Sequence, residues 1–313
     1  SLEFSPRMIP FFDTLIPYLQ ELKSLSMSTF SSEPSPIYFA SLHQLKKLKN
    51  LEIFGFNVVK DSQVFANVIG KMKTLEKLKL GDKNINMELL LPNLVGMKQL
   101  KSLTLSHVGE ITEPLGRALK DMKKLEVLKL DGLSGSHWPE DIAEGLGSMP
   151  LLKHLELAPG VSLFRDNNAR IKPLSQKFTA VLANITQLTY LGLQNTKIDA
   201  TSAPHLAQAL PALVQLKTLD LSYNSIDDKA LKHLGPAFSQ LTQLRYIFFS
   251  RNNIMLATKE NGLALALPKL VHLKELSLCF NKLGDRGLKH LGLSQVPQLR
   301  LLSLASNKIK LKT

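Results

Sequence analysis

The chain has 313 residues, of which 44% are hydrophobic but only 6% aromatic, so a folded core must be built mainly from aliphatic side chains. Its one cysteine, Cys279, excludes an internal disulfide and a cysteine-cluster metal site, and it favours a reducing compartment, the cytoplasm. Lys and Arg exceed Asp and Glu by 13, which favours acidic partners without identifying one.

In chain order, residues 1–4 read as a cloning scar, because the chain starts with serine, and we leave them out of the predicted fold. Residues 10–20 are expected to form the helical part of a repeat that precedes the first strand. No apolar run reaches the ~20 residues that cross a bilayer, and the N-terminal segment lacks the order of a signal peptide. We therefore expect no membrane insertion.

From there on, one pattern recurs along the chain, and residues 216–226 show it most fully as LxxLxLxxN followed by an aliphatic residue. Nine of the ten spacings between repeats lie between 25 and 29 residues, within the period expected of leucine-rich repeats, and the tenth is 36. The first apolar residues of the eleven repeats are Leu22, Leu48, Leu75, Leu100, Leu125, Leu152, Leu188, Leu216, Leu244, Leu273 and Leu299.

Each repeat is predicted to contain one strand and one helix. Leu219 and Leu221 lie two positions apart, as inward side chains of a strand do, and the segment that follows carries apolar residues at helical spacing. A single strand and helix cannot bury their apolar faces alone, but stacked repeats can. The sequence therefore predicts an α/β leucine-rich repeat solenoid of about eleven repeats, a horseshoe with a parallel β-sheet on the concave face and helices on the convex face.

The asparagines Asn224, Asn252, Asn281 and Asn307 fall where the chain leaves each strand, so we expect their amides to bond backbone groups of neighbouring repeats. Earlier repeats have other residues there, so their turns should be less regular. The 36-residue spacing indicates a loop insertion. We predict one domain over residues 5–313, with irregular repeats over 5–157, the insertion over 158–180 and regular repeats over 181–313.

Residues 226–234 and 283–291 resemble leucine-rich repeats of the ribonuclease-inhibitor type, which also occur in cytosolic immune receptors. The resemblance implies a helical convex side. The lysine-rich, uneven repeats more weakly resemble the leucine-rich repeat effectors that intracellular bacteria such as Legionella inject into host cells, which implies action in the host cytoplasm.

The best candidate site is a patch of aromatic and charged residues on the concave face of the seventh to tenth repeats. Because Ile247 and Phe249 must point inward, Tyr246 and Phe248 must lie outside, where exposed aromatics on a rigid sheet can anchor a partner. The candidate residues are Tyr190, Asp220, Tyr223, Tyr246, Phe248, Arg251, Glu275 and Phe280. The alternative is that these aromatics pack on one another and merely cover the sheet.

A second candidate is a basic column one residue after the first leucine of each repeat. Eight of its eleven positions are basic, so the column could bind an acidic protein or a phosphate backbone. The alternative is that lysine at this position only solvates the surface, with its aliphatic stem covering the core. The basic positions are Lys23, Lys49, Lys101, Lys153, Lys217, Arg245, Lys274 and Arg300.

Signs of catalysis are scarce. No histidine is placed near Cys279 in its repeat or at adjacent strand positions to activate it, and no phosphate-binding glycine loop or HExxH motif occurs. We expect no enzyme activity, no metal and no cofactor. The leading hypothesis is a non-catalytic protein-binding module, and its narrower form is the recognition part of a secreted bacterial effector.

The alternatives are a nucleic-acid or polyanion binder, an inhibitor or receptor, and the recognition domain of a ubiquitin ligase complex. Residues 308–313 stop just after the last turn, so we expect the chain to be a fragment of a longer protein. The oligomeric state is open.

Overall fold

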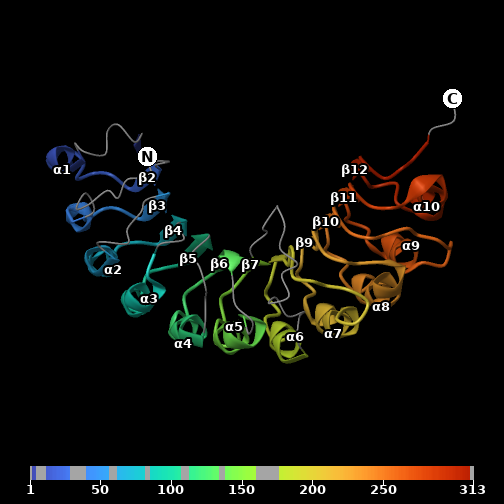
Figure 1. Cartoon of the computed structure of the whole chain (residues 1–313), viewed down its shortest axis with the longest axis horizontal. Coiled ribbons are helices and arrows are strands. Elements are labelled where there is room, and N and C mark those ends of the chain that lie inside the picture. Colours follow the sequence, from blue (N-terminus) through green and yellow to red (C-terminus); the bar gives the residue numbers. More distant parts are fainter. Residues whose placement is uncertain are drawn as a thin grey trace. The chain divides into compact units, whose positions relative to one another are not determined.

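The computed structural model describes residues 2–4, 12–28, 40–55, 62–81, 85–106, 113–133, 138–159 and 176–310. The chain divides into two compact units, unit 1 (Ser1–Leu152) and unit 2 (Lys153–Thr313). In each unit, strands that neighbour one another in sequence pair in parallel, and helices lie on one side of the strands (Figure 1). Each unit therefore has the two layers that the sequence predicts.

Unit 1 alternates strands with helices. Its strands are β1 Leu2–Phe4, β2 Ser24–Ser28, β3 Asn50–Phe54, β4 Lys77–Gly81, β5 Ser102–Ser106 and β6 Val127–Leu133. Its helices are α1 Phe12–Leu15, α2 Ser62–Lys71, α3 Met87–Val95, α4 Glu113–Asp121 and α5 Trp138–Leu146, with the 3-10 turns η2 Ile16–Tyr18 and η3 Leu42–Gln44.

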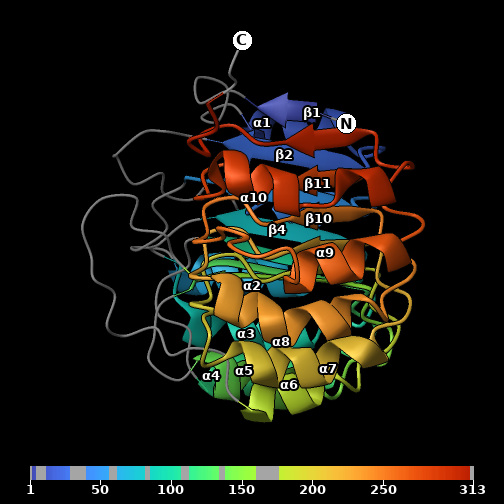
Figure 2. The same cartoon turned by 90° about the vertical axis from the view of Figure 1, so that its right-hand side faces the viewer.

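Unit 2 repeats the same alternation, and its helices stack one above another in front of its strands (Figure 2). Its strands are β7 His154–Pro159, β8 Tyr190–Gly192, β9 Thr218–Asp220, β10 Tyr246–Phe248, β11 Glu275–Ser277 and β12 Leu301–Ser303. Its helices are α6 Gln176–Leu182, α7 Ala203–Ala209, α8 Asp228–Phe238, α9 Gly262–Ala266 and α10 Gly284–His290, with the 3-10 turns η5 Leu210–Ala212, η6 Leu267–Lys269 and η7 Leu293–Gln295.

All eleven predicted strands are present, as β2 to β12, and the predicted helical segment before the first strand contains α1 and η2. Residues 2–4, which we left out of the predicted fold, form β1 and pair with β2, with Leu2 opposite Leu25. Their origin as a cloning scar stays a prediction. Of the predicted insertion, residues 158–159 belong to β7 and residues 176–180 to α6, while the rest lies outside the described residues.

The core is aliphatic, as the composition requires. Along β2, β3, β5, β9 and β10, buried and half-buried side chains alternate, and around β9 Leu219 and Leu221 are fully buried whereas Thr218 and Asp220 are half-buried. Ile247 and Phe249 are fully buried, which confirms their predicted inward orientation. The strand register is therefore fixed by the leucine pattern, since a slip by one residue would expose this set.

The asparagine ladder predicted for the later repeats is present. Asn252 Nδ2 donates to the carbonyl oxygens of Leu221 and Phe249 at 3.0 Å, and its Oδ1 accepts from Ile226 N at 2.9 Å. Asn224, Asn281 and Asn307 make the equivalent bonds. Because each buried amide bonds to the preceding repeat as well as its own, it joins the two repeats.

One repeat earlier, Thr196 stands in place of asparagine. Its hydroxyl donates to Leu193 O at 2.9 Å, so it satisfies a carbonyl of its own repeat. In unit 1, the equivalent positions Lys83 and Val108 lie outside the described residues, whereas Leu133 is the last residue of β6.

Helices α8 and α9 approach each other so closely that glycine is needed at their contact. A Cβ on Gly262 would lie 1.8 Å from the carbonyl oxygen of Leu231, and a Cβ on Gly235 would lie 2.3 Å from the carbonyl oxygen of Gly262. Both contacts are with backbone, which cannot move aside as a side chain can. The absence of two side chains therefore sets the distance between these helices.

Candidate functional site

The eight candidate residues all lie in unit 2, on or directly after strands β8 to β11. We call this surface the strand face of unit 2, meaning the half-buried or exposed positions of β7 to β12 and of the residues that directly follow them. In the parallel register, Tyr246 lies beside Glu275, and Phe248 lies beside Asp220. Tyr190 lies one strand further away, beside Thr218.

At the carboxyl ends of the strands, three candidate residues form a stacked group that we call the arginine ladder: Tyr223, Arg251 and Phe280. The guanidinium carbon of Arg251 lies 4.3 Å from the centre of the Phe280 ring and 5.3 Å from that of the Tyr223 ring. Phe280 is 47% and Tyr223 41% exposed, and Arg251 is exposed too. A cation between two aromatic rings is attracted by both ring quadrupoles, so the ladder holds itself in place at the surface.

The backbone explains why these three side chains meet. Tyr223, Arg251 and Phe280 all have positive φ, between 55° and 60°, which non-glycine residues rarely adopt. Each N–H donates across to the next repeat: Tyr223 N to Ser250 O at 2.8 Å, Arg251 N to Cys279 O at 2.9 Å, and Phe280 N to Ala305 O at 2.8 Å. The equivalent residues Asn195 and Ser306 share this conformation, so it belongs to the repeat.

No hydrogen bond or ion pair joins the Arg251 side chain to any described residue. Asp220, one of the two candidate carboxylates, accepts from Ser222 N at 2.9 Å and from Gln194 Nε2 at 2.8 Å instead. A guanidinium has five N–H donors in a fixed plane. Arg251 therefore has N–H donors that no described residue accepts.

Tyr190 belongs to a different group, the tyrosine cluster: His154, Glu156, Tyr190, Gln194 and Asp220. The His154 and Tyr190 rings stack with centroids 3.9 Å apart and planes 4° from parallel. Burial, together with the carboxylates of Glu156 and Asp220, raises the pKa of Tyr190 to about 12. The phenol therefore stays protonated at neutral pH.

Gly192 lies under this cluster. A Cβ there would lie 2.9 Å from Gln194 Oε1 and 3.1 Å from both Glu156 Cγ and Tyr190 Cε1, so these side chains fill the space above the glycine. For Tyr190, the alternative of packing within the protein therefore has direct support. His154 and Gln194 were not predicted from the sequence, although the register position shared by His154 and Tyr190 could have identified the former.

Tyr246 and Phe248 are half-buried. Their predicted outward orientation agrees with the burial of Ile247 between them, but they are less accessible than Tyr223 and Phe280.

Cys279 is half-buried, and its Sγ accepts from Ser277 Oγ at 3.9 Å. Among the described residues, no group of three or more His, Cys, Asp or Glu side chains could hold a metal ion.

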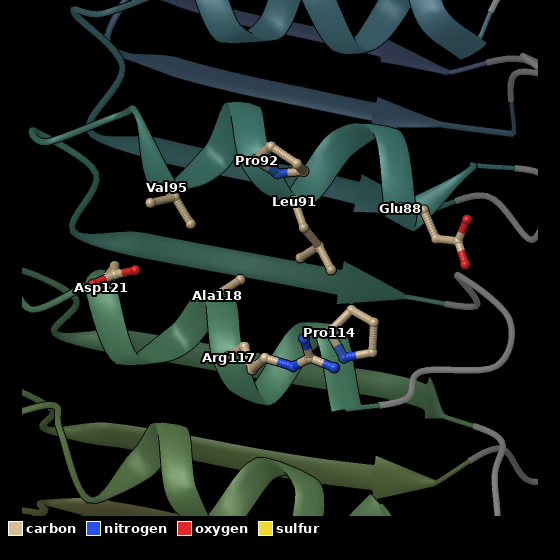
Figure 3. Close-up of a pocket in the computed structure, with 8 residues that line it drawn as sticks. All are labelled: Glu88, Leu91, Pro92, Val95, Pro114, Arg117, Ala118 and Asp121. Carbon is tan, nitrogen blue, oxygen red and sulfur yellow. The ribbon is translucent and has the colours of Figure 1, made fainter.

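Unit 1 contains a groove between α3 and α4 with a volume of about 420 Å³. Figure 3 shows its lining: Leu91, Pro92 and Val95 from α3 and Pro114 and Ala118 from α4, with the charged residues Glu88, Arg117 and Asp121 around them. This groove was not predicted from the sequence. Its lining is mainly apolar, and the three charged residues come from both helices.

The comparisons with known proteins agree with this architecture. A family model described as leucine-rich repeat matches residues 215–235 and 269–292. A search of curated proteins found no match. The match covers two short segments, and together with the repeated strands and helices it supports a leucine-rich repeat solenoid fold.

Two solved structures with similar folds are an internalin (inlF) from Listeria monocytogenes and a chain of the Arabidopsis receptor kinase HAESA in complex with the peptide hormone IDA and the co-receptor SERK1. The internalin match has a TM-score of 0.56 and 20% identity, and it covers 97% of this chain and 72% of the internalin. The receptor match has a TM-score of 0.54 and 21% identity, over 92% of this chain and 43% of the other. At these identities, the likeness concerns the fold.

No described helix is both long and apolar enough to span a bilayer.

Proposed function

We propose that the chain is a non-catalytic protein-binding module that holds a macromolecular partner on the strand face of unit 2. The observation that carries the proposal is the arginine ladder, because it places two exposed aromatic rings and an arginine without a hydrogen-bond acceptor on one rigid surface. Aromatic residues and arginine are the side chains most enriched at binding hot spots. The repeat positions them without adding any catalytic group.

The remaining candidate residues surround this contact. Phe248 and Tyr246 on β10 lie between the neighbouring Asp220 and Glu275, so half-buried apolar surface adjoins carboxylates that can bond a partner. Tyr190 lies further along the face, where its ring stacks on that of His154. A partner would therefore meet a central aromatic area with polar groups around it, as specific interfaces do.

Comparison with solved structures adds one supporting point. The similar receptor kinase structure is a complex with a peptide hormone and a co-receptor, so the fold accommodates polypeptide ligands. We further propose that the repeats are of the ribonuclease-inhibitor type and that the chain is the recognition part of an effector acting in the cytoplasm. The paired segments 226–234 and 283–291 and the single cysteine support these assignments.

The experiment is capture of a partner from host-cell and bacterial lysates by the immobilised chain, followed by quantitative mass spectrometry. The test variant combines Tyr223→Ala, Arg251→Ala and Phe280→Ala. The control combines Val214→Ala and Leu265→Ala, two residues that are 54% and 62% exposed and lie outside the strand face. We expect one specific protein to be captured by the wild type and the control and lost with the triple variant.

Two results would count against the proposal. One is the absence of any specific protein in both lysates. The other is equal capture by the wild type and by a folded triple variant, since the arginine ladder would then not be part of the interface.

A further inference from the structure

The positive charge of the chain is concentrated in unit 2. Residues 153–313 contain 21 Lys and Arg against 9 Asp and Glu, an excess of 12, whereas residues 1–152 contain 18 against 17, an excess of 1. Both units are built from the same repeat, so the repeat itself does not require the excess. Such an asymmetry points to an acidic partner for one part of the chain.

Four of these cations form a continuous line, which we call the basic row: Lys217, Arg245, Lys274 and Arg300. Each directly precedes a strand, β9 to β12 in turn. The backbone joins them, because Arg245 N donates to Lys217 O, Lys274 N to Arg245 O and Arg300 N to Lys274 O, each at 2.8 Å. Neighbouring strands of a sheet lie about 4.8 Å apart, so the backbones that carry successive cations of the row are separated by about that distance.

Two lysines of the same column in unit 1 share an internal carboxylate. Glu76 occupies the position between Lys49 and Lys101 and bonds both, at 2.6 Å and 2.9 Å. Those two lysines hold the pKa of Glu76 at about 2, so the carboxylate stays charged. In unit 2, no ion pair joins a member of the basic row to any described residue, and three of the four are exposed, Lys274 being half-buried.

The loops that lead into the strands of unit 2 contain no acidic residue at all. Asp and Glu are absent from segments 183–189, 210–217, 239–245, 267–274 and 291–300. Each segment carries a glutamine or histidine directly before the first leucine of the next repeat: Gln187, Gln215, Gln243, His272 and Gln298. Of these, Gln215, Gln243 and His272 are exposed, and their side chains can bond the backbone of a polypeptide, whereas Gln298 Nε2 already donates to Leu270 O at 2.8 Å. The basic row is therefore bordered on its loop side by neutral polar groups.

On its other side, the basic row is bordered by carboxylates. Glu275 directly follows Lys274, and Asp220 lies within the strand that Lys217 precedes. A broad polyanion such as a nucleic-acid duplex would bring phosphates against these carboxylates, which repel them. A single acidic chain that lies along the row would keep its negative charges away from these carboxylates.

We propose that the basic row binds an acidic segment of a partner polypeptide, with Asp or Glu side chains opposite Lys217, Arg245, Lys274 and Arg300. This inference rests on the proposed function in assigning a polypeptide partner to unit 2, and it specifies the chemistry of that partner. It uses a surface distinct from the arginine ladder, since the row lies at the start of the strands and the ladder follows their ends.

The test measures binding of the full chain to poly-L-glutamate and to single-stranded poly(U) RNA as a function of salt concentration. The test variant combines Lys217→Gln, Arg245→Gln, Lys274→Gln and Arg300→Gln. The matched control combines Lys23→Gln, Lys49→Gln, Lys98→Gln and Lys101→Gln, four exposed lysines of unit 1. Both variants lose four positive charges, so net charge alone cannot separate them, and thermal melting checks that each is folded.

We expect the wild type to bind poly-L-glutamate more tightly than poly(U), and the test variant to lose about tenfold or more in affinity because several exposed charge pairs are removed together. The control should retain the wild-type affinity within about threefold. Equal losses in both variants, or no binding of poly-L-glutamate by the wild type, would overturn the proposal. Tighter binding of poly(U) that depends on the basic row would replace it with a nucleic-acid site.

The outcome is independent of the capture experiment on the arginine ladder. If a partner is captured through the ladder while the basic row binds no poly-L-glutamate, only the inference about the row fails. If poly-L-glutamate binds the row but no partner is captured through the ladder, the proposed interface on the strand face fails instead.

Discussion

The guanidinium carbon of Arg251 lies 4.3 Å from the ring centre of Phe280, in the next repeat, and both residues have positive φ. The repeat imposes this conformation, because Asn195 and Ser306 adopt it at equivalent positions. The backbone conformation is thus common to the neighbouring repeats, whereas the arginine and the phenylalanine side chains are specific to two of them. A substitution of these side chains can therefore change binding while the backbone conformation, and with it the stability, is retained.

Replacing Phe280 with glycine should weaken partner binding with little loss of stability. Glycine removes the ring and also removes the strain of a non-glycine residue at positive φ, a gain of about 1–2 kcal/mol in the free energy of unfolding. Because glycine makes the unfolded chain more flexible, it costs about 0.5–1 kcal/mol, and the two effects roughly cancel. We expect binding to fall about tenfold, as for a hot-spot aromatic. Partner titration and thermal melting measure the two effects. Ser306→Gly, at the equivalent position without a ring, is the control and should leave binding unchanged.

Replacing Asn252 with alanine should reduce the free energy of unfolding by about 2–3 kcal/mol, because buried backbone groups of two repeats lose their partners. Chemical denaturation measures the loss. Asn253 is the matched control, since its side chain makes no hydrogen bond to a described residue. Equal losses from Asn252→Ala and Asn253→Ala would show that the amide ladder adds nothing.

Gly262→Ala should destabilise unit 2 through the contact of α8 with α9. The added methyl group would meet the carbonyl oxygen of Leu231, and forcing the helices apart should cost about 1–3 kcal/mol. Gly284 offers a contrast, because its φ is +58° but a Cβ added there would have nothing within 4 Å. Thermal melting should show the larger loss for Gly262→Ala than for Gly284→Ala, and the reverse order would contradict the steric explanation.

The ion pairs of Glu76 predict a specific dependence of stability on pH. Its hydrogen bonds to Lys49 and Lys101 lower its pKa from 4.5 to about 2, so the contribution is complete above pH 4.5 and is lost as the pH falls toward 2. The melting temperature of the wild type should exceed that of Glu76→Gln at pH 6, and the difference should disappear near pH 2. High salt should also reduce it, because the lysines are exposed. A difference that does not change with pH would exclude this ion-pair explanation.

The parts of the fold that follow from periodicity could be predicted from the sequence. Leu219 and Leu221 predicted a strand because alternation has a direct geometric meaning, and Asn252 predicted a bonded turn because its amide suits that position. The close contact at Gly262 could not be predicted in this way. It depends on the distance between two helices, as does the groove that Leu91 and Ala118 line in unit 1.

The candidate site was predicted in outline but not in its contacts. The repeat register placed Tyr246 and Phe248 outward, yet it could not indicate how much of each ring the neighbouring side chains would cover. Nor could it show that Tyr190 would stack on His154 above Gly192, since that depends on side-chain rotamers. The stacking of Arg251 between two rings likewise depends on rotamers that the repeat pattern does not specify.

A residue in the left-handed conformation follows each strand from β8 to β12, and it also bears on how such a protein can change its ligand. Its N–H holds the next repeat, while its side chain takes no part in the core, so Tyr223, Arg251 and Phe280 can be exchanged without rebuilding the repeats. Randomising these three codons would give a library of surfaces on one scaffold. Selection from that library could evolve new specificities while the leucine framework stays constant.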